Sequence, residues 1–207
     1  MWKTIFSRWF RVSLLAWAGV GAQIHLAVAG TDDPRITFRH PALAGNFASL
    51  NVMLNPALAP GETLDVYSNG HLAARIKGTG LGIERVAFYI ALVDDGAIEA
   101  RILDGSGNTL ITRTTTIPSD VPRLKNPPPV EQTMDRPSVN RVMARKNKVM
   151  LELQHGLAPG RTGHISLKSE TGSLNLKVTP YIWKKAKLIF WLDRDAGKMA
   201  VTDTRAE

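Results

Sequence analysis

The sequence predicts an all-β protein made of two tandem immunoglobulin-like β-sandwich domains joined by a proline-rich linker. Three observations predict it: apolar residues recur at every second position, turn residues interrupt these segments at short intervals, and prolines gather near the middle of the chain. A period of two is the pattern of strands with one buried face, and short strands with frequent turns are typical of sandwiches. We predict domains at residues 34–117 and 138–207 and a linker at 118–137.

Residues 1–29 have the features of a secretory signal peptide. Three basic residues precede an apolar segment at 12–20, and no acidic residue occurs before Asp32. That segment is too short to span a bilayer, and the Ala-Val-Ala at 27–29 matches a cleavage site. An uncleaved anchor is the alternative, because apolar residues continue past position 20. We expect a periplasmic or secreted protein without stable membrane insertion after cleavage.

In the first half, Val86, Phe88, Ile90 and Leu92 recur at every second position, and residues 98–102 alternate between apolar and charged positions. Asn69-Gly70 lies between two further apolar segments and is the strongest indication of a hairpin, because both residues tolerate positive φ. The turn residues at 94–96 and 104–108 separate the next strands. These elements predict a first sandwich.

The second half shows the same alternation at residues 149–153, 174–178 and 188–192. Between the halves, residues 118–137 contain six of the twelve prolines, including Pro127-Pro128-Pro129. Such a run favours extended polyproline conformation and makes a semi-rigid spacer. We therefore place the domain boundary there.

An internal repeat accompanies this division. Val52-Met53-Leu54 precedes Pro60-Gly61, and Val149-Met150-Leu151 precedes Pro159-Gly160. Both segments predict a strand, a Pro-Gly turn and a second strand. Duplication explains the similarity, but two unrelated sandwiches that each use a common turn explain it as well.

Composition and motifs exclude most enzyme classes. The 207 residues include no cysteine, which excludes disulfide scaffolds, thiol nucleophiles, Cys-ligated zinc and iron–sulfur clusters. No nucleophile elbow, zincin helix, P-loop or dinucleotide fingerprint occurs. The net charge of +8 falls to +5 without the three leader cations, and +5 compels neither nucleic-acid nor membrane binding.

Several smaller patterns have a functional and a structural interpretation. The mature histidines lie far apart in the sequence, and they form a metal site only if the fold brings them together: His40, His71, His155 and His164. Asp193–Gly197 and Asp104–Asn108 resemble the start of a calcium loop but lack its closing glutamate, so turns explain them better. We predict no catalytic, cofactor-binding or metal-ligating residues, and no enzyme activity.

Two basic clusters are candidates for polyanion binding. The first contains Arg141, Arg145, Lys146 and Lys148, and the second contains Lys184, Lys185 and Lys187 near Trp183 and Trp191. Basic and aromatic side chains together bind nucleic acid, but an exported protein rarely meets it. Lys184, Lys185 and Lys187 also fit a charged strand flank or edge that discourages pairing with another chain, which we favour over a binding patch.

The two halves together resemble SoxY followed by SoxZ, the paired β-sandwich carrier subunits of periplasmic thiosulfate oxidation. The likeness is greatest to fused SoxYZ-like carriers associated with quinoprotein dehydrogenases. In the first half it depends on three segments, Leu64–Gly70, Arg85–Leu92 and Ala97–Gly105. In the second half it depends on Val149–Leu153 followed by His155 and Gly160, and on Ile189–Asp193 followed by Gly197.

The sequence departs from this family at its functional residue. SoxY carries its sulfur intermediate on a cysteine in a flexible glycine-rich arm, whereas the corresponding segment here is Ser119–Pro122. Another side chain cannot replace a thiolate as a reversible sulfur nucleophile. In the second half, Gly156 also replaces the proline of the family's His-Pro turn. Thiosulfate-carrier activity is therefore not expected.

Three functions follow as hypotheses. The first is a non-catalytic binding or scaffold protein of SoxYZ-like fold, accessory to a periplasmic redox system, with a quinoprotein dehydrogenase or cytochrome as partner. The second is a generic tandem immunoglobulin-like module that binds a surface or a ligand. The third is a metal-binding or hydrolytic enzyme that uses His and Asp from both halves. We favour the first, and expect no cofactor and no nucleic-acid partner.

Overall fold

The computed structural model describes residues 34–39, 43–44, 47–91, 97–117, 133–182 and 187–207. The predicted signal peptide, His40, the turn at 94–96, most of the proline-rich segment and Trp183 to Lys185 lie outside these residues. Residues 33–207 form one compact unit. Its described elements are all strands, so the predicted all-β class is confirmed.

The strands are β1 (Ile36–Arg39), β2 (Leu43–Ala44), β3 (Phe47–Leu58), β4 (Thr63–Ser68), β5 (His71–Thr79), β6 (Ile83–Ala91), β7 (Ile98–Leu103), β8 (Thr109–Thr115), β9 (Thr133–Met134), β10 (Val139–Arg145), β11 (Lys148–Leu153), β12 (Gly156–Leu157), β13 (Gly163–Lys168), β14 (Ser173–Val178), β15 (Lys187–Leu192) and β16 (Ala200–Ala206).

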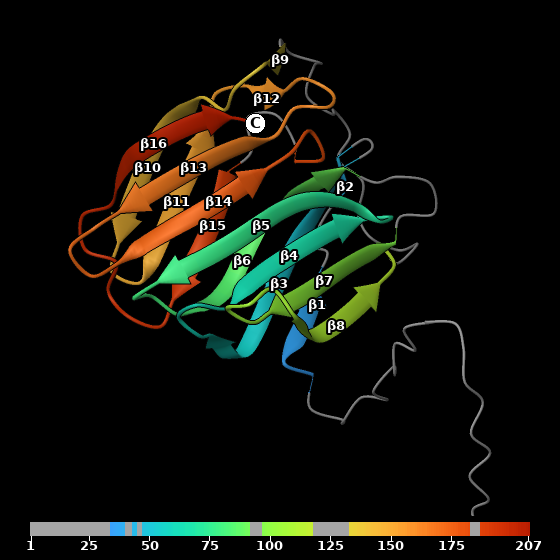
Figure 1. The fold of residues 1–207 in the computed structure, drawn as a ribbon, viewed down its shortest axis with the longest axis horizontal. Coiled ribbons are helices and arrows are strands. Elements are labelled where there is room, and N and C mark those ends of the chain that lie inside the picture. The colour runs from blue at the N-terminus through green and yellow to red at the C-terminus, as the bar shows by residue number, and fades with distance from the viewer. Residues whose placement is uncertain (1–33, 40–42, 45–46, 92–96, 118–132, 183–186) are drawn as a thin grey trace, which may run out of the picture. The chain divides into compact units, whose positions relative to one another are not determined.

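Two large sheets form a sandwich of the immunoglobulin-like type (Figure 1). Sheet A has the order β1-β3-β6-β15-β11-β10, with β2 paired to β3. Sheet B has the order β16-β13-β14-β5-β4-β7-β8 and lies in front in Figure 1. A parallel pair of two short strands, β9 and β12, lies apart from them.

The predicted turns have the expected backbone. Asn69 and Gly70 have φ of 45° and 80°, and they join β4 to β5 in an antiparallel hairpin. The Asp104 carboxylate accepts hydrogen bonds from the backbone N–H groups of Ser106 and Asn108, both at 2.8 Å. An Asp that satisfies its own turn in this way explains the segment without calcium.

The two halves are joined within both sheets. β6 pairs with β15 in sheet A, and β5 pairs with β14 in sheet B, both antiparallel. We call these two pairings the seam. The structure thus differs from two separate tandem sandwiches, because each sheet is continuous through both halves and the edge strands at the seam satisfy each other's backbone groups. The domain bounds at 34–117 and 138–207 stay a prediction.

The internal repeat has a structural counterpart at the seam. Val52 pairs with Val86 on β6, and its counterpart Val149 pairs with Phe190 on β15. Val86 and Phe190 then pair with each other across the seam. The order β1-β3-β6 is likewise mirrored by β10-β11-β15, and β7-β4-β5 by β16-β13-β14. This arrangement is that of two similar units related by an approximate two-fold axis, and it favours duplication.

The core lies between the sheets and extends through both halves as one cluster. Phe190 is the largest fully buried side chain, and its partner Val86 is fully buried as well. Each side chain of this kind stabilises the fold by about 1.5–3 kcal/mol through burial. The seam is therefore held by core packing as well as by backbone hydrogen bonds.

Candidate functional site

The candidate ligands that the structure describes are not gathered into a metal site. His71, His155 and His164 lie on or next to different strands, and His71 stacks on Tyr181 with ring centroids 4.9 Å apart. Within the described ranges, no group of three or more His, Asp or Glu residues is placed to hold a metal ion. No helix in these ranges is long and apolar enough to cross a membrane.

The second calcium-like segment is a loop that leads from β15 in sheet A to β16 in sheet B, and not a hairpin turn. Asp193 accepts a hydrogen bond from the backbone N–H of Gly82 at 2.9 Å and pairs with Arg194 at 2.7 Å. These contacts, the Arg194 hydrogen bond first, lower the pKa of Asp193. Gly197, with φ of 62°, donates its N–H to Asp195 at 2.8 Å. The carboxylates thus hold the loop before β16.

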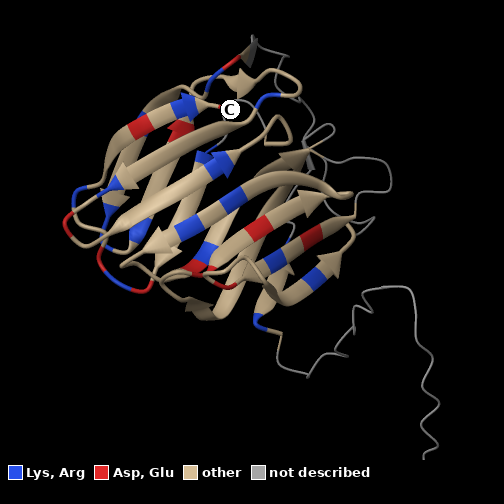
Figure 2. Ribbon diagram, viewed as in Figure 1, with Lys and Arg blue, Asp and Glu red and all other residues tan. Residues whose placement is uncertain are grey.

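The strongest concentration of charge lies on the outer face of sheet B. One transverse row of paired positions crosses six strands; we call it the central row, and it consists of Arg205, His164, Lys177, Arg75, Asp65 and Arg101. Figure 2 shows basic residues on β16, β14 and β5 across this face. Paired side chains on one sheet face are about 5 Å apart, so like charges opposite each other are unfavourable.

In the first half, a buried carboxylate neutralises the row. Asp65 is fully buried and accepts two hydrogen bonds from Arg75, at 2.7 and 2.6 Å. The Tyr67 hydroxyl donates a third at 3.1 Å. The Asp65 hydrogen bond raises the pKa of Arg75, and burial, with the nearby Asp65 charge, raises that of Tyr67. A bidentate pair of this geometry fixes the guanidinium in one orientation.

In the second half, the neutralising carboxylate comes from Glu207, which follows β16. Lys177 donates a hydrogen bond to one carboxylate oxygen at 2.6 Å, and His164 Nε2 lies 3.0 Å from the other. The direction of the His164 ring N–H is not that of a hydrogen bond, so this contact is an ion pair when the ring is protonated. Lys177 first, then His164, lowers the pKa of Glu207 to about 2.

These side chains line a depression of about 410 Å³ on the outer face, which we call the cationic groove. Its basic residues are Arg75, Lys77, Lys177, Arg205 and His164, and Glu207 is its one acidic lining residue. Asp65 also pairs with Arg75, and Asp203 lies 3.6 Å from Arg205. Four permanently cationic side chains therefore meet three side-chain carboxylates. The volume is within the usual range of ligand sites.

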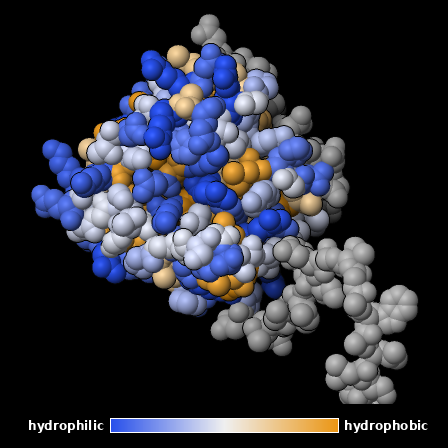
Figure 3. All heavy atoms as spheres, viewed as in Figure 1, coloured by the Kyte–Doolittle hydropathy of each residue, from blue (hydrophilic) through white to orange (hydrophobic). Residues whose placement is uncertain are grey.

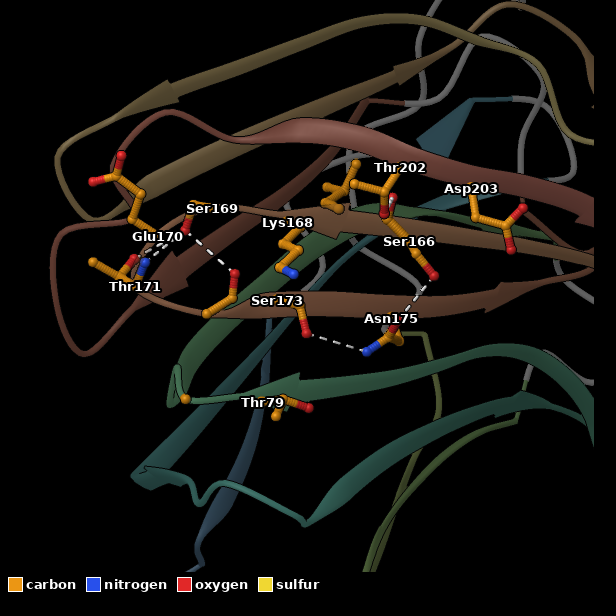
Figure 4. A pocket seen from close by; sticks show the side chains of 13 residues that line it. Thr79, Ser166, Lys168, Ser169, Glu170, Thr171, Ser173, Asn175, Thr202 and Asp203 are labelled. Carbon is orange, nitrogen blue, oxygen red and sulfur yellow. Dashed lines mark hydrogen bonds between the residues drawn. The ribbon is translucent and has the colours of Figure 1, made fainter.

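A second depression of about 610 Å³ adjoins it, and we call it the hydroxyl groove (Figure 4). The two grooves share Ser166 and Asn175, whose side chains are hydrogen-bonded at 2.9 Å. Ser169 and Thr171 form a hydrogen bond at 2.9 Å near its outer end. The face around both grooves is mainly hydrophilic (Figure 3). Polar groups that converge in this way can bind a polar ligand.

The outer face of sheet A is different in character. Trp191 lies between two cations, with Arg85 4.1 Å and Lys148 5.2 Å from its ring centroid. The Asn51 side chain accepts a hydrogen bond from Arg85 at 2.5 Å and fixes the guanidinium over the ring. Both contacts have cation–π geometry. This cluster contains Trp191 of the second predicted basic cluster and Lys148 of the first. Lys187 of the second cluster lies at the start of β15 opposite Glu152.

The first predicted basic cluster lies at one side of sheet A. Arg141 and Arg145 are exposed on β10, which ends the described strand order of that sheet, and Lys146 is in the β10–β11 turn with φ of 53°. Charges on this outermost described strand disfavour pairing with another chain. The sheet edge predicted for the second cluster is not found at Lys187, because β15 lies between β6 and β11. The sequence analysis did not single out the cationic groove, because its cations come from β5, β14 and β16, which are far apart in the chain.

Searches against family models and against curated proteins find no match to this sequence.

Proposed function

We propose that the chain is a non-catalytic exported binding or scaffold protein of SoxYZ-like fold, accessory to a periplasmic redox system such as sulfur oxidation or a quinoprotein dehydrogenase. The observation that supports this proposal is the seam, where β6 pairs with β15 and β5 with β14. A fused pair of carrier-like subunits needs its halves to pack as one body. Independent domains on a flexible linker do not need such pairing between them.

The composition limits what such a protein does. The chain has no cysteine, so it cannot carry a sulfur intermediate on a thiolate. What remains is recognition of a partner through the exposed sheet faces. The proposed role is therefore to hold or position a redox enzyme or cytochrome, without covalent chemistry.

Capture from native periplasm tests the proposal. The tagged, exported chain is expected to retain a dehydrogenase or cytochrome at near-stoichiometric yield in physiological salt. Salt must be varied, because a basic protein also collects acidic bystanders at low ionic strength. The Trp191→Ala variant is a useful second bait, since it removes the aromatic group on sheet A. If no redox protein is retained by either bait, the redox assignment is wrong.

A generic ligand-binding module of immunoglobulin-like fold is the second candidate. The two adjoining grooves on sheet B favour it, because together they offer cations, hydroxyl groups and an amide to one ligand. A chain that purifies with a bound small molecule and no protein partner would support this candidate over the first.

A further inference from the structure

Glu207 already occupies the cationic groove as an internal ligand. Its carboxylate contacts Lys177 at 2.6 Å and His164 at 3.0 Å. Its backbone N–H donates to the Thr162 carbonyl at 2.8 Å, which places the residue beside β13. The groove therefore shows, with a group of its own chain, how it holds a carboxylate.

We propose that the cationic groove binds an acidic polypeptide segment of the partner, whose carboxylates displace that of Glu207. This inference rests on the proposed function in that the partner is a protein. The chemistry of the ligand follows from the occupant: a glutamate side chain fits between Lys177 and His164, so another Asp or Glu side chain makes the same contacts.

Displacement costs little because Glu207 is loosely held. Its side chain is 57% exposed, and its two ion-pair partners remain in place when it leaves. An exposed ion pair of this kind contributes little net free energy, because water solvates both charges well. Asp65 provides the contrast: it is fully buried under Arg75 and cannot exchange with a ligand.

The surrounding groups favour a polypeptide over other polyanions. The groove continues through Ser166 and Asn175 into the hydroxyl groove, whose Ser and Thr side chains can hydrogen-bond to the peptide groups of an extended segment. Two carboxylates, Glu170 and Asp203, also line the hydroxyl groove, so the acidic side chains of the ligand belong in the cationic groove. The described lining of both grooves has no Phe, Tyr or Trp side chain, and His164 is its single aromatic ring. A row of stacking platforms, which supports single-stranded nucleic-acid binding, is therefore absent from this lining.

Binding of hexaglutamate to the purified full chain, measured by isothermal titration calorimetry, tests the inference. We expect saturable binding that weakens with salt, and none of hexaglutamine at the same concentration. Glu207→Gln is expected to bind about three- to fivefold more tightly, because it removes the competing charge. Lys177→Gln is expected to bind about three- to fivefold more weakly, and Lys77→Gln is the substitute if that variant does not fold.

Lys198→Gln is the matched control, because it removes the same charge from an exposed loop residue outside the groove lining. Equal weakening in Lys198→Gln and Lys177→Gln would reduce the effect to net charge and overturn the inference. So would a Glu207→Gln variant that binds no more tightly than the unchanged chain. If a heparin-derived hexasaccharide binds with the same dependence on the variants and hexaglutamate does not bind, the ligand is an acidic glycan and the peptide inference is overturned.

These outcomes are separate from the test of the proposed function. If hexaglutamate binds but no redox protein is captured, the groove still binds acidic peptides and the proposed redox partner is wrong. The opposite result is also informative. If hexaglutamate does not bind, and Lys177→Gln captures the redox protein as well as the unchanged chain does, the proposed function stands and the inference about the groove is overturned.

Discussion

Arg75 and Lys177 face each other across the seam at equivalent positions of the two halves, yet their acidic partners differ. In the first half the partner is Asp65, which is fully buried on the neighbouring strand. In the second half the equivalent position is His164, and the carboxylate comes from the exposed Glu207. One fold thus carries a fixed counter-charge on one side of its axis and an exchangeable one on the other.

The difference teaches how a symmetric body acquires one binding site. Two facing cations repel each other, so the seam is more stable when each half supplies a carboxylate. The first half satisfies this need inside the sheet, where solvent does not reach Asp65. The second half satisfies it from a residue beyond the last strand, so its cation stays available to a competing anion.

The largest expected effect concerns the apolar side of the seam. Phe190→Ala is expected to lower the free energy of unfolding by about 4 kcal/mol, and Val86→Ala by about 2 kcal/mol, because each leaves a cavity in the shared core. Urea unfolding measures both values. Amide hydrogen exchange in β4 should accelerate in Phe190→Ala as well, since we expect the halves to unfold together. Unchanged exchange in β4 would show that the halves are energetically independent.

A smaller effect separates the two counter-charges. Asp65→Asn is expected to cost about 2 kcal/mol, because Arg75 loses a bidentate partner that water replaces only in part. Glu207→Gln is expected to lower the free energy of unfolding by much less than Asp65→Asn does, because the Glu207 contacts are exposed and screened. Urea unfolding at low ionic strength measures both losses, because urea is uncharged and does not screen the ion pairs. Equal losses in the two variants would contradict the proposed difference between a fixed and an exchangeable carboxylate.

The smallest expected effect is a shift in titration. The pKa of Glu207 is lowered to about 2 from an ordinary value of 4.5, chiefly by the Lys177 hydrogen bond. The ionised form is favoured in the folded state, so its contribution is complete above pH 4.5 and is lost as the pH falls through about 2. Carboxyl NMR should give a midpoint near 2, and Lys177→Gln should move that midpoint upward. A midpoint that stays in place would show that Lys177 does not hold the carboxylate.

Much of the fold could be predicted from the sequence. Alternation identified the strands, and Asn69-Gly70 and Asp104–Asn108 identified turns, because local chemistry determines both. Alternation also tells which side chains share a face, but it does not tell which strands are neighbours. For that reason two tandem sandwich domains were predicted, while the pairing of their strands at the seam was left open.

The candidate site shows the same limit more sharply. Lys77 and Lys177 are unremarkable alternating lysines in the sequence, 100 positions apart, and only the pairing of β5 with β14 brings their strands together. His164 was considered as a metal ligand, whereas the structure places it beside a carboxylate and two cations. The repeat at Val52 and Val149 was the one sequence feature that pointed to the approximate axis, and the groove lies close to it.

The seam also determines whether the two halves stay associated when the chain between them is cut. Each half presents complementary strand edges to the other in both sheets, so the pairing does not depend on the peptide chain that connects them. Two fragments produced by cleavage between the halves are expected to remain associated and to co-elute as one particle. The same edges on a second molecule are equally compatible, and a concentrated sample is therefore expected to form reciprocally exchanged dimers in which each body is assembled from two chains.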